Sequence, residues 1–488
     1  MKKGIVMKKK IFVLLVIISI IVLTILFINN KSIYISKKML QEENNMESAW
    51  DFKENLNIGW SLGMSLSANI KYPELIKYKL VIDENESNQF ETSHENIYTL
   101  NKKTNSKLKI IFEIPYSNLD GTLYWTIEKL MLDNTIIYLN EDFESIVEDG
   151  KLYIEIDNNK EISYDTIQIN IKIKKYYENN TLEKLNFYET FWCEDVTTKE
   201  LISTLKNKGF NAIRISFDIY NHVDINNKID DLWLNRLKEI VDYCIDLDVY
   251  CLVDIIETYD LYVNNINEEI VNLYISHWKE VATLFKDYNH KLLFSPFNEI
   301  RTMQGDWSIK ETEILNNMNY LYQVFVDTIR STGSNNAYRN LILTTYAAGI
   351  NQEIVDNFKV PNDSTYNHLL IECHNYNPVN FTFNEINLGS TDFVNEWGSF
   401  KDKKDLRSVF KLFNSLVKKT KIPLIIGEFG AVDRTSVEER LEYLSYYKKQ
   451  AKKYNMGLFI FDDAHDFVII DRKTYKFIDE EIIDMLVS

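Results

Sequence analysis

The sequence predicts an α/β protein built on a (β/α)8 barrel, or TIM barrel, with an all-β sandwich-like domain inserted after the first barrel strand. From Thr197 onward, helical and extended segments alternate strictly, which is typical of parallel β/α units. Between residues 69 and 181 the chain has short alternating stretches separated by Asn, Asp and Gly turns, which indicates antiparallel strands. An apolar N-terminal run adds a transmembrane helix to this prediction.

The N-terminal run is just long enough to span a bilayer. Residues 11–28 are 18 uncharged residues, and lysines occupy positions 8–10. The positive-inside rule therefore predicts residues 1–10 as a cytoplasmic tail, followed by a single-pass anchor in the cell membrane. Residues 29–50 are polar and mixed, as expected of an extracellular stalk. Secretion after signal cleavage is the alternative, although no small-x-small pattern follows the run.

The first barrel strand is expected within "LNIGWSLGMSLS", residues 56–67, which ends in a glycine-punctuated loop. The barrel is predicted to comprise residues 51–68 and 182–488, and the inserted domain residues 69–181. Because the insertion follows a strand, it belongs to the loop-bearing face on which barrels of this kind build their sites.

The remaining barrel elements follow from the alternation of helix and strand. The helix in "TTKELISTLKNKG" has a threonine start and a glycine stop. Apolar runs of strand length recur after it, and with "NIGW" they count to eight. These runs are "FNAIRIS", "VYCLVDI", "KLLFSP", "LILTTY", "LLIECHNY", "PLIIGE" and "GLFIF".

Composition excludes some classes of function. The formal net charge is -17, from 55 basic and 72 acidic side chains, which argues against a nucleic-acid partner. The four cysteines show no CxxC or Cys/His metal spacing. We therefore expect neither a metal site nor a cofactor. Aromatic residues make up 13% of the chain, and although most belong to the core, aromatic faces can also stack on sugar rings.

Two glutamates come directly after buried strands. Glu299 follows Asn298 in "LLFSPFNEIR", and Glu428 lies in "IPLIIGEFGAVDR". Residues just past a strand's C-terminal end lie on the face where barrel active sites are built. Two carboxylates delivered there from different strands are the minimum equipment for hydrolysing a glycosidic bond. The pair therefore indicates a carbohydrate-active protein.

Several fragments resemble glycoside hydrolase family 5, in its bacterial endoglucanase branch. They recur in family order from Asn57 to Leu66 and from Phe187 to the end of the chain, whereas the insertion resembles no family that we can name. The family has the (β/α)8 fold and a retaining mechanism. The fragments include "FYETFWCEDVTTKELI", "RISFDIYNHVD", "LFKDYNHKLLFSPFNEIR", "TTYAAGIN", "HNYNP", "EWGSFKD" and "IPLIIGEFGAV".

The resemblance implies roles for the matched residues. Glu299 matches the family's acid/base and Glu428 its nucleophile. Arg214 matches an arginine that holds the nucleophile ionised, as a nearby guanidinium would. A retaining enzyme needs one carboxyl protonated and the other ionised, with the two about 5 Å apart.

Further matches concern sugar binding. Asn298 matches the asparagine that binds the sugar 2-hydroxyl. His374 and Tyr376 match the pair that lines the reacting subsite and orients the two carboxylates. Trp397, in "NEWGS", follows a strand and is expected to stack on substrate, although it could equally cap the barrel rim.

Two positions depart from the family pattern. Ile256, followed by Glu257, stands where the family has a histidine in the active-site floor. Ile460 and Phe461 stand where tryptophan normally provides a stacking platform, and Phe461 keeps an apolar ring that could partly substitute. The chain thus lacks a hydrogen-bonding orienter and the usual platform.

These features predict a retaining, endo-acting hydrolase of β-1,4-glucan. Cellulose-type polymers are the expected substrates, and xyloglucan, mixed-linkage glucan and mannan are related candidates. The two departures support an alternative, a non-catalytic membrane-anchored glucan-binding protein derived from the enzyme. A transglycosylase that uses the same covalent intermediate is a third, weaker possibility. The expected partners are a polysaccharide and the membrane.

Overall fold

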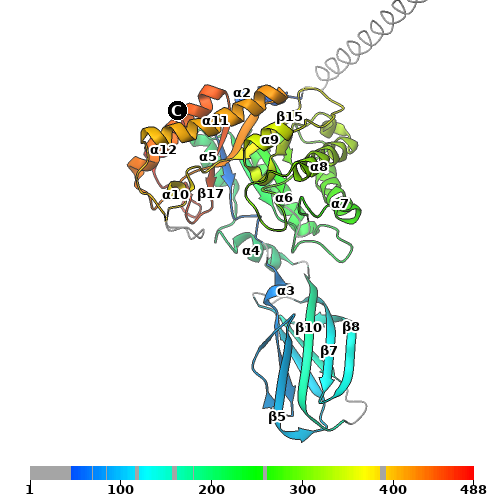
Figure 1. Ribbon diagram of the computed structural model, residues 1–488. Helices are drawn as coiled ribbons and strands as arrows, with labels where there is room; N and C mark the ends of the chain where they lie inside the picture. Colours follow the sequence, from blue (N-terminus) through cyan, green and yellow to red (C-terminus); the bar gives the residue numbers. More distant parts are fainter. Residues whose placement is uncertain are drawn as a thin grey trace, which may run out of the picture.

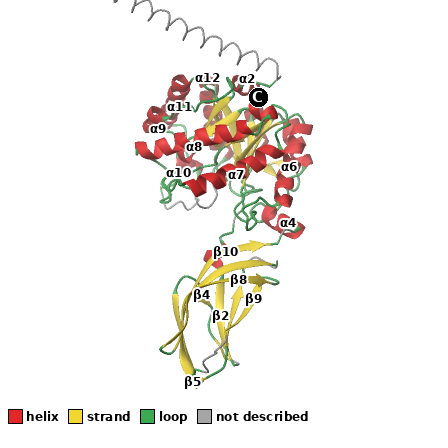
Figure 2. Ribbon diagram, turned by 90° about the vertical axis from the view of Figure 1, so that its right-hand side faces the viewer, coloured by secondary structure: helices red, strands yellow, loops and turns green. Residues whose placement is uncertain are grey.

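The structure, a computed structural model, describes residues 46–488 except residues 69, 84, 116–119, 157–161, 180, 257–260 and 385–391. It has two parts: a barrel ringed by helices, and a pair of β-sheets beyond one end of it (Figures 1 and 2). The predicted cytoplasmic tail, the anchor at residues 11–28 and most of the stalk lie outside the described residues. Within the described residues, no helix is long and apolar enough to cross a membrane.

The predicted (β/α)8 barrel is confirmed. Its eight strands are all parallel and pair in chain order, and β1 closes the barrel by pairing with both β11 and β17. The strands are almost wholly buried, because helices cover their outer face and the barrel interior covers the other. They are β1 (Gly59–Leu62), β11 (Ala212–Phe217), β12 (Tyr250–Ile255), β13 (Leu292–Ser295), β14 (Leu341–Thr344), β15 (Leu369–His374), β16 (Leu424–Phe429) and β17 (Gly457–Asp462).

Helices ring the barrel as amphipathic elements. The Thr198 side chain caps α5 by accepting a hydrogen bond from the Leu201 N–H, and Gly209 ends it with a positive φ of 123°, as predicted from the sequence. The helices are α2 (Ala49–Asn55), α3 (Tyr72–Leu75), α4 (Leu182–Thr190), α5 (Lys199–Lys208), α6 (Asp231–Asp246), α7 (Glu268–Leu284), α8 (Thr312–Ser331), α9 (Gln352–Asn357), α10 (Val379–Thr382), α11 (Phe400–Thr420), α12 (Val437–Tyr454) and α13 (Glu480–Val487), with 3-10 turns η1 (Ser334–Ala337) and η2 (Tyr346–Ala348).

The barrel interior is layered. Helix α2 precedes β1 and closes the N-terminal mouth, where Phe52 packs with inward residues of the strands such as Leu252 and Leu370. Side chains two residues further along a strand point to the same side. In β12 and β15 those next inward residues are Asp254 and Glu372, both buried. The interior therefore changes from an apolar layer to a polar layer just below the C-terminal mouth.

The inserted segment forms two antiparallel sheets between β1 and β11. One sheet has the order β5-β10-β7-β8, and the other has the order β3-β2-β6-β9, with β4 also paired to β2. The strands are β2 (Lys77–Ile82), β3 (Asn85–Glu86), β4 (Phe90–Glu91), β5 (Glu95–Thr104), β6 (Leu108–Glu113), β7 (Gly121–Leu132), β8 (Thr135–Val147), β9 (Lys151–Ile156) and β10 (Tyr164–Glu178), and a short hairpin of β18 (Ile470–Asp471) and β19 (Lys476–Phe477) lies near the C-terminus.

An aromatic core holds the two sheets together. The Trp125 ring is fully buried and stacks on Phe143 at 4.6 Å, with Phe112 edge-on at 4.9 Å. Tyr124, the next residue along β7, points the other way and meets Tyr177 edge-on. The two neighbours therefore form no shared flat platform, which agrees with the alternation expected of a strand.

Polar contacts join the sheets to the loop-bearing face of the barrel. The Tyr72 and Tyr188 hydroxyls both donate to the carboxylate of Glu178, at the end of β10. Asn221, in the loop after β11, exchanges two hydrogen bonds with the Ile70 backbone. The insertion is thus fixed to the same end of the barrel as the C-terminal ends of its strands.

Candidate active site

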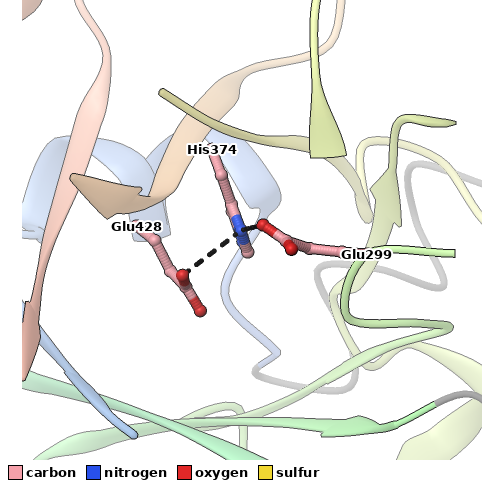
Figure 3. Close-up of side chains that lie close together, drawn as sticks. All are labelled: Glu299, His374 and Glu428. Atoms are coloured by element: carbon pink, nitrogen blue, oxygen red, sulfur yellow. Dashed lines mark hydrogen bonds and ion pairs between the residues drawn. The ribbon is translucent and has the colours of Figure 1, made fainter. Parts of the chain in front are cut away.

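Glu299 and Glu428 meet at the C-terminal mouth of the barrel. Glu299 lies in the loop after β13, and Glu428 lies on β16. Figure 3 shows both side chains directed toward His374, and one oxygen of each glutamate lies within 4.8 Å of the other and of a ring nitrogen of His374. Carboxyl groups about 5 Å apart suit a retaining mechanism, whereas inverting enzymes leave a wider gap for water.

Two donors contact Glu428. The Arg214 guanidinium, on β11, donates from Nη1 to Oε1 at 3.0 Å, and the Tyr376 hydroxyl donates to Oε2 at 2.8 Å. Both oxygens of the carboxylate therefore accept a hydrogen bond, which orients the side chain and favours its anionic form. These contacts are those expected for a residue that attacks a carbon centre.

His374 bridges the two glutamates. It ends β15, and its Nδ1 lies 2.8 Å from Glu299 Oε1 and 3.5 Å from Glu428 Oε2. Although burial opposes its charge, Glu428, Glu299 and Glu372 raise the pKa of His374 to about 10. The carboxylates on both sides of the ring therefore favour its protonated form, which donates from both nitrogens.

The pKa of Glu428 differs from the prediction that Arg214 holds this carboxyl ionised. Burial raises the pKa of Glu428, and neighbouring Glu299 acts in the same direction, whereas His374, Arg214 and the Tyr376 hydrogen bond lower it. The net direction is upward, so Arg214 alone does not hold this pKa below its ordinary value. The cations and the tyrosine offset much of the cost of burying the charge.

Asn298 lies beside the pair in the same loop as Glu299. Its Oδ1 accepts a hydrogen bond from Arg214 Nη2 at 3.0 Å. This contact fixes which end of the side-chain amide is the carbonyl and leaves the NH2 group free to donate elsewhere. The arrangement suits an amide that presents a donor to a sugar hydroxyl.

Two buried carboxylates that the sequence interpretation overlooked complete the site. Glu372 Oε1 accepts from Arg214 Nε at 2.6 Å, and Asp254 Oδ2 lies 3.1 Å from Arg214 Nη2. Burial raises the pKa of Asp254 to about 7. For Glu372, burial opposes the anion, but Arg214 and His374 lower the pKa to about 2. Arg214 thus contacts three carboxylates, and we call Arg214, Asp254, Glu372 and Glu428 the Arg214 cluster.

The two predicted stacking residues have different surroundings. Phe461 lies at the mouth, edge-on to Tyr376 at 6.2 Å and beside Phe467 at 5.5 Å, and its ring is partly exposed. The prediction for Trp397 is wrong, because its ring is only 5% exposed and packs on Tyr443 of α12. A ring buried against a helix has no free face for a sugar.

Other polar residues in the loops after the barrel strands have structural roles. His222 is buried and stacks on Trp233 at 3.8 Å, which fixes the loop after β11. Asp463 accepts hydrogen bonds from backbone N–H groups in the loop after β17, and Asp462 pairs with Arg472. The pair therefore shapes the last loop. Ile256 directly follows β12, as the sequence predicted, whereas Glu257 lies outside the described residues.

The spacing of Glu299, His374 and Glu428 would also suit a metal ion. However, the side chains are already engaged with one another and with their neighbours, since His374 Nδ1 bonds Glu299 Oε1 and the Tyr376 hydroxyl donates to Glu428 Oε2. The three side chains instead form a hydrogen-bonded acid–base set, as in Figure 3.

Comparison with known proteins agrees with this geometry. A family model described as cellulase (glycosyl hydrolase family 5) matches residues 175–462. Endoglucanase A from Clostridium longisporum is 31% identical over 317 residues, which cover 62% of this chain and 59% of that protein. Endoglucanase B from Neocallimastix patriciarum is 33% identical over 311 residues, which cover 62% of this chain and 64% of that protein. The chain therefore spans less than two thirds of the length of these relatives.

Among solved structures, one similar chain is a glycoside hydrolase family 5 lichenase from Caldicellulosiruptor sp. F32, in complex with cellotetraose. It is 33% identical with a TM-score of 0.57, and the match covers 63% of this chain and 88% of that one.

Proposed function

Because this chain belongs to the cellulase family of glycoside hydrolases, family 5, we propose that it is a retaining, endo-acting hydrolase of β-1,4-linked glucan. The observation that carries the proposal is the pair Glu299 and Glu428, whose carboxylate oxygens lie within 4.8 Å at the mouth of the barrel. Each carboxylate has its own hydrogen-bond partners, and the two therefore have distinct environments, as a double displacement requires.

In the first step, Glu428 attacks the anomeric carbon while Glu299 protonates the departing glycosidic oxygen. The bond to the leaving sugar breaks, and a covalent ester to Glu428 forms. His374 donates to Glu299 Oε1, so that Oε2 is left to carry the transferred proton. In the second step, Glu299 takes a proton from water as the water oxygen attacks the same carbon, and Glu428 leaves as a carboxylate.

The neighbouring residues would support these steps. Arg214 and Tyr376 stabilise Glu428 as an anion before attack and after release. Asn298 would donate to the sugar 2-hydroxyl, a contact that strengthens in the transition state of such enzymes. Phe461 offers a partly exposed ring beside Tyr376 for the reacting sugar.

The substrate class follows from the relatives. Two of them are named endoglucanases, and the similar solved structure is a lichenase with cellotetraose bound. We expect cellulose-type glucan, xyloglucan or mixed-linkage glucan to be cleaved at internal bonds of the polysaccharide. The barrel would act outside the cell, anchored by residues 11–28 in the cell membrane, or free after signal cleavage. Membrane fractionation of the full chain, compared with a chain that starts at Asn45, tests the anchor.

A non-catalytic glucan-binding protein is the second candidate function. Ile256 and Ile460 favour it, because they replace the family's floor histidine and stacking tryptophan. Against it stand Glu299, Glu428 and their donors, since binding alone needs no acid–base pair.

One experiment separates these functions. Reducing ends released from carboxymethyl-cellulose, xyloglucan, barley β-glucan and mannan are measured for the wild type and for Glu428→Gln. Release that the substitution abolishes supports the hydrolase, and the preferred polymer names the substrate. Binding without release, equal in both proteins, contradicts the enzyme and supports the receptor. Product analysis with an added sugar acceptor separates hydrolysis from transglycosylation.

A further inference from the structure

Glu372 lies beneath the two catalytic glutamates and touches the residues that hold both of them. It is fully buried on β15, two residues before His374. Its Oε1 accepts from Arg214 Nε at 2.6 Å and lies 3.3 Å from His374 Nε2. Its Oε2 accepts from the hydroxyls of Ser295 at 2.9 Å and Thr344 at 3.1 Å. Each oxygen thus has two partners, contributed by strands β11, β13, β14 and β15.

The space for this carboxylate is built into the neighbouring strand. Gly427 precedes Glu428 on β16, and a Cβ atom added there would lie 1.9 Å from Glu372 Oε1. A larger residue at this position would therefore displace Glu372 or the backbone that carries Glu428. Burying a carboxylate is costly unless all its lone pairs are used, as they are here.

We propose that Glu372 is a positioning residue that sets the orientation of Glu428 through Arg214 and of Glu299 through His374. This inference rests on the proposed function. Glu372 does not reach the substrate, because it lies below both glutamates in the polar layer of the barrel. Glu372 contacts both Arg214 and His374. Arg214 in turn contacts Glu428, and His374 contacts Glu299.

The same contacts set the charge of His374. The ring has Glu372 at one nitrogen and Glu299 and Glu428 at the other, so that it is surrounded by carboxylates. The charged and titratable groups around it are Arg214 from β11, Asp254 from β12, Glu299 after β13, Glu372 from β15, Tyr376 after β15 and Glu428 from β16. Removing the charge of Glu372 lowers the pKa of His374, and the ring then loses its proton at a lower pH.

The test follows the His374 ring by NMR in the full chain, with histidine labelled at Cε1. The chain has seven histidines, and the signal missing in a His374→Asn variant identifies the ring. In the wild type, the signal is expected to stay constant from about pH 6 to about pH 9. In Glu372→Gln its titration midpoint is expected to fall into this range. A wild-type midpoint near 6.5, the ordinary value for histidine, or no shift in the variant overturns the proposal.

Kinetics give the second readout. Because small displacements of reacting groups slow catalysis strongly, kcat of Glu372→Gln is expected to fall on the order of 100-fold with little change in KM. Its alkaline activity limit is expected to move to lower pH. Glu372→Asp keeps the charge and is expected to lie between the wild type and the Gln variant in both readouts. An equal loss in the Asp and Gln variants, with an unchanged pH profile, contradicts a positioning role.

Glu189→Gln is the matched control. Glu189 is also a buried carboxylate paired with an arginine, Arg236, but it lies on α4 and bonds Arg236 and the Thr197 backbone rather than the residues around His374. This variant is expected to lose stability without shifting the His374 titration. If Glu372→Gln does not fold, the Glu372→Asp variant and the wild type still decide the outcome. If the wild type cleaves no polymer, the proposed function fails, whereas the His374 titration still tests this inference.

Discussion

The barrel and the inserted sandwich bury different kinds of side chain. The barrel interior encloses Arg214 with Asp254, Glu372 and Glu428, all nearly inaccessible to solvent. In the described part of the sandwich, every fully buried large side chain is apolar or aromatic, and its lysines and glutamates pair on the surface. Burying charge lowers stability unless it is fully paired. The comparison therefore separates a region organised for chemistry from one organised for packing.

The strongest test of this comparison removes the buried guanidinium of Arg214. Arg214→Met keeps much of the side-chain volume but removes the guanidinium that contacts three buried carboxylates. We expect a stability loss of about 3–5 kcal/mol, as found when a buried ion pair is broken, and a fall in hydrolysis of at least about 100-fold. Denaturant unfolding and reducing-sugar release measure the two effects. Wild-type activity in this variant would contradict a role for Arg214 in the site.

A matched change in the sandwich is expected to separate stability from activity. Trp125→Ala removes a fully buried ring that stacks on Phe143, which costs about 3–5 kcal/mol in protein cores. Because the ring belongs to the sandwich core, kcat/KM per folded molecule is expected to stay at the wild-type value. Active-site titration of the folded fraction beside calorimetry checks this. A selective loss of kcat/KM would mean that the sandwich takes part in catalysis.

The pH dependence of stability sharpens the comparison further. Burial raises the pKa of Asp254 from about 3.9 in an unfolded chain to about 7. The folded state then holds a proton that the unfolded state has lost, so stability from this group is complete below about pH 4 and is lost as pH rises through about 7. Asp254→Asn cannot titrate. The difference in Tm, variant minus wild type, is therefore expected to become more positive from pH 4 to pH 7, and a constant difference would contradict this.

The smallest effect is expected on the surface of the sandwich. Lys129 pairs with Glu95 across the sheet at 2.9 Å, but both side chains are substantially exposed. Exposed pairs contribute about 0–1 kcal/mol. Lys129→Ala is therefore expected to change the free energy of unfolding by less than about 0.5 kcal/mol, and a loss as large as that of Arg214→Met would erase the contrast between the two regions.

Sequence patterns were sufficient to predict the barrel and the position of Glu299 and Glu428 at its mouth. Parallel strands covered on both faces are continuous apolar runs, and a glutamate that ends such a run, as Glu428 does, must lie at the mouth. The antiparallel segment was equally visible from its alternation, because one face of each strand is buried and the other is wet.

The polar layer escaped sequence reasoning for a physical reason. Asp254 and Glu372 are single acidic residues inside runs such as "LLIECHNY", and a pattern along one strand does not show which residue faces them from another. The available signal was that a carboxylate inside a fully buried strand needs a partner, and Arg214 sits at the same level of the barrel. The stacking prediction for Trp397 failed for a related reason, because the position of this residue after a strand does not reveal the helix that covers its ring.

Helix α2 gives the molecule a direction. It closes the barrel floor just after the segment that carries the proposed anchor, while the inserted sheets lie at the opposite end (Figure 1), where Glu299 and Glu428 also lie. A chain held by its first residues is thus held by its closed end. If residues 11–28 anchor the protein as proposed, the open end would point away from the membrane, and a long polymer would cross the mouth without meeting the membrane surface.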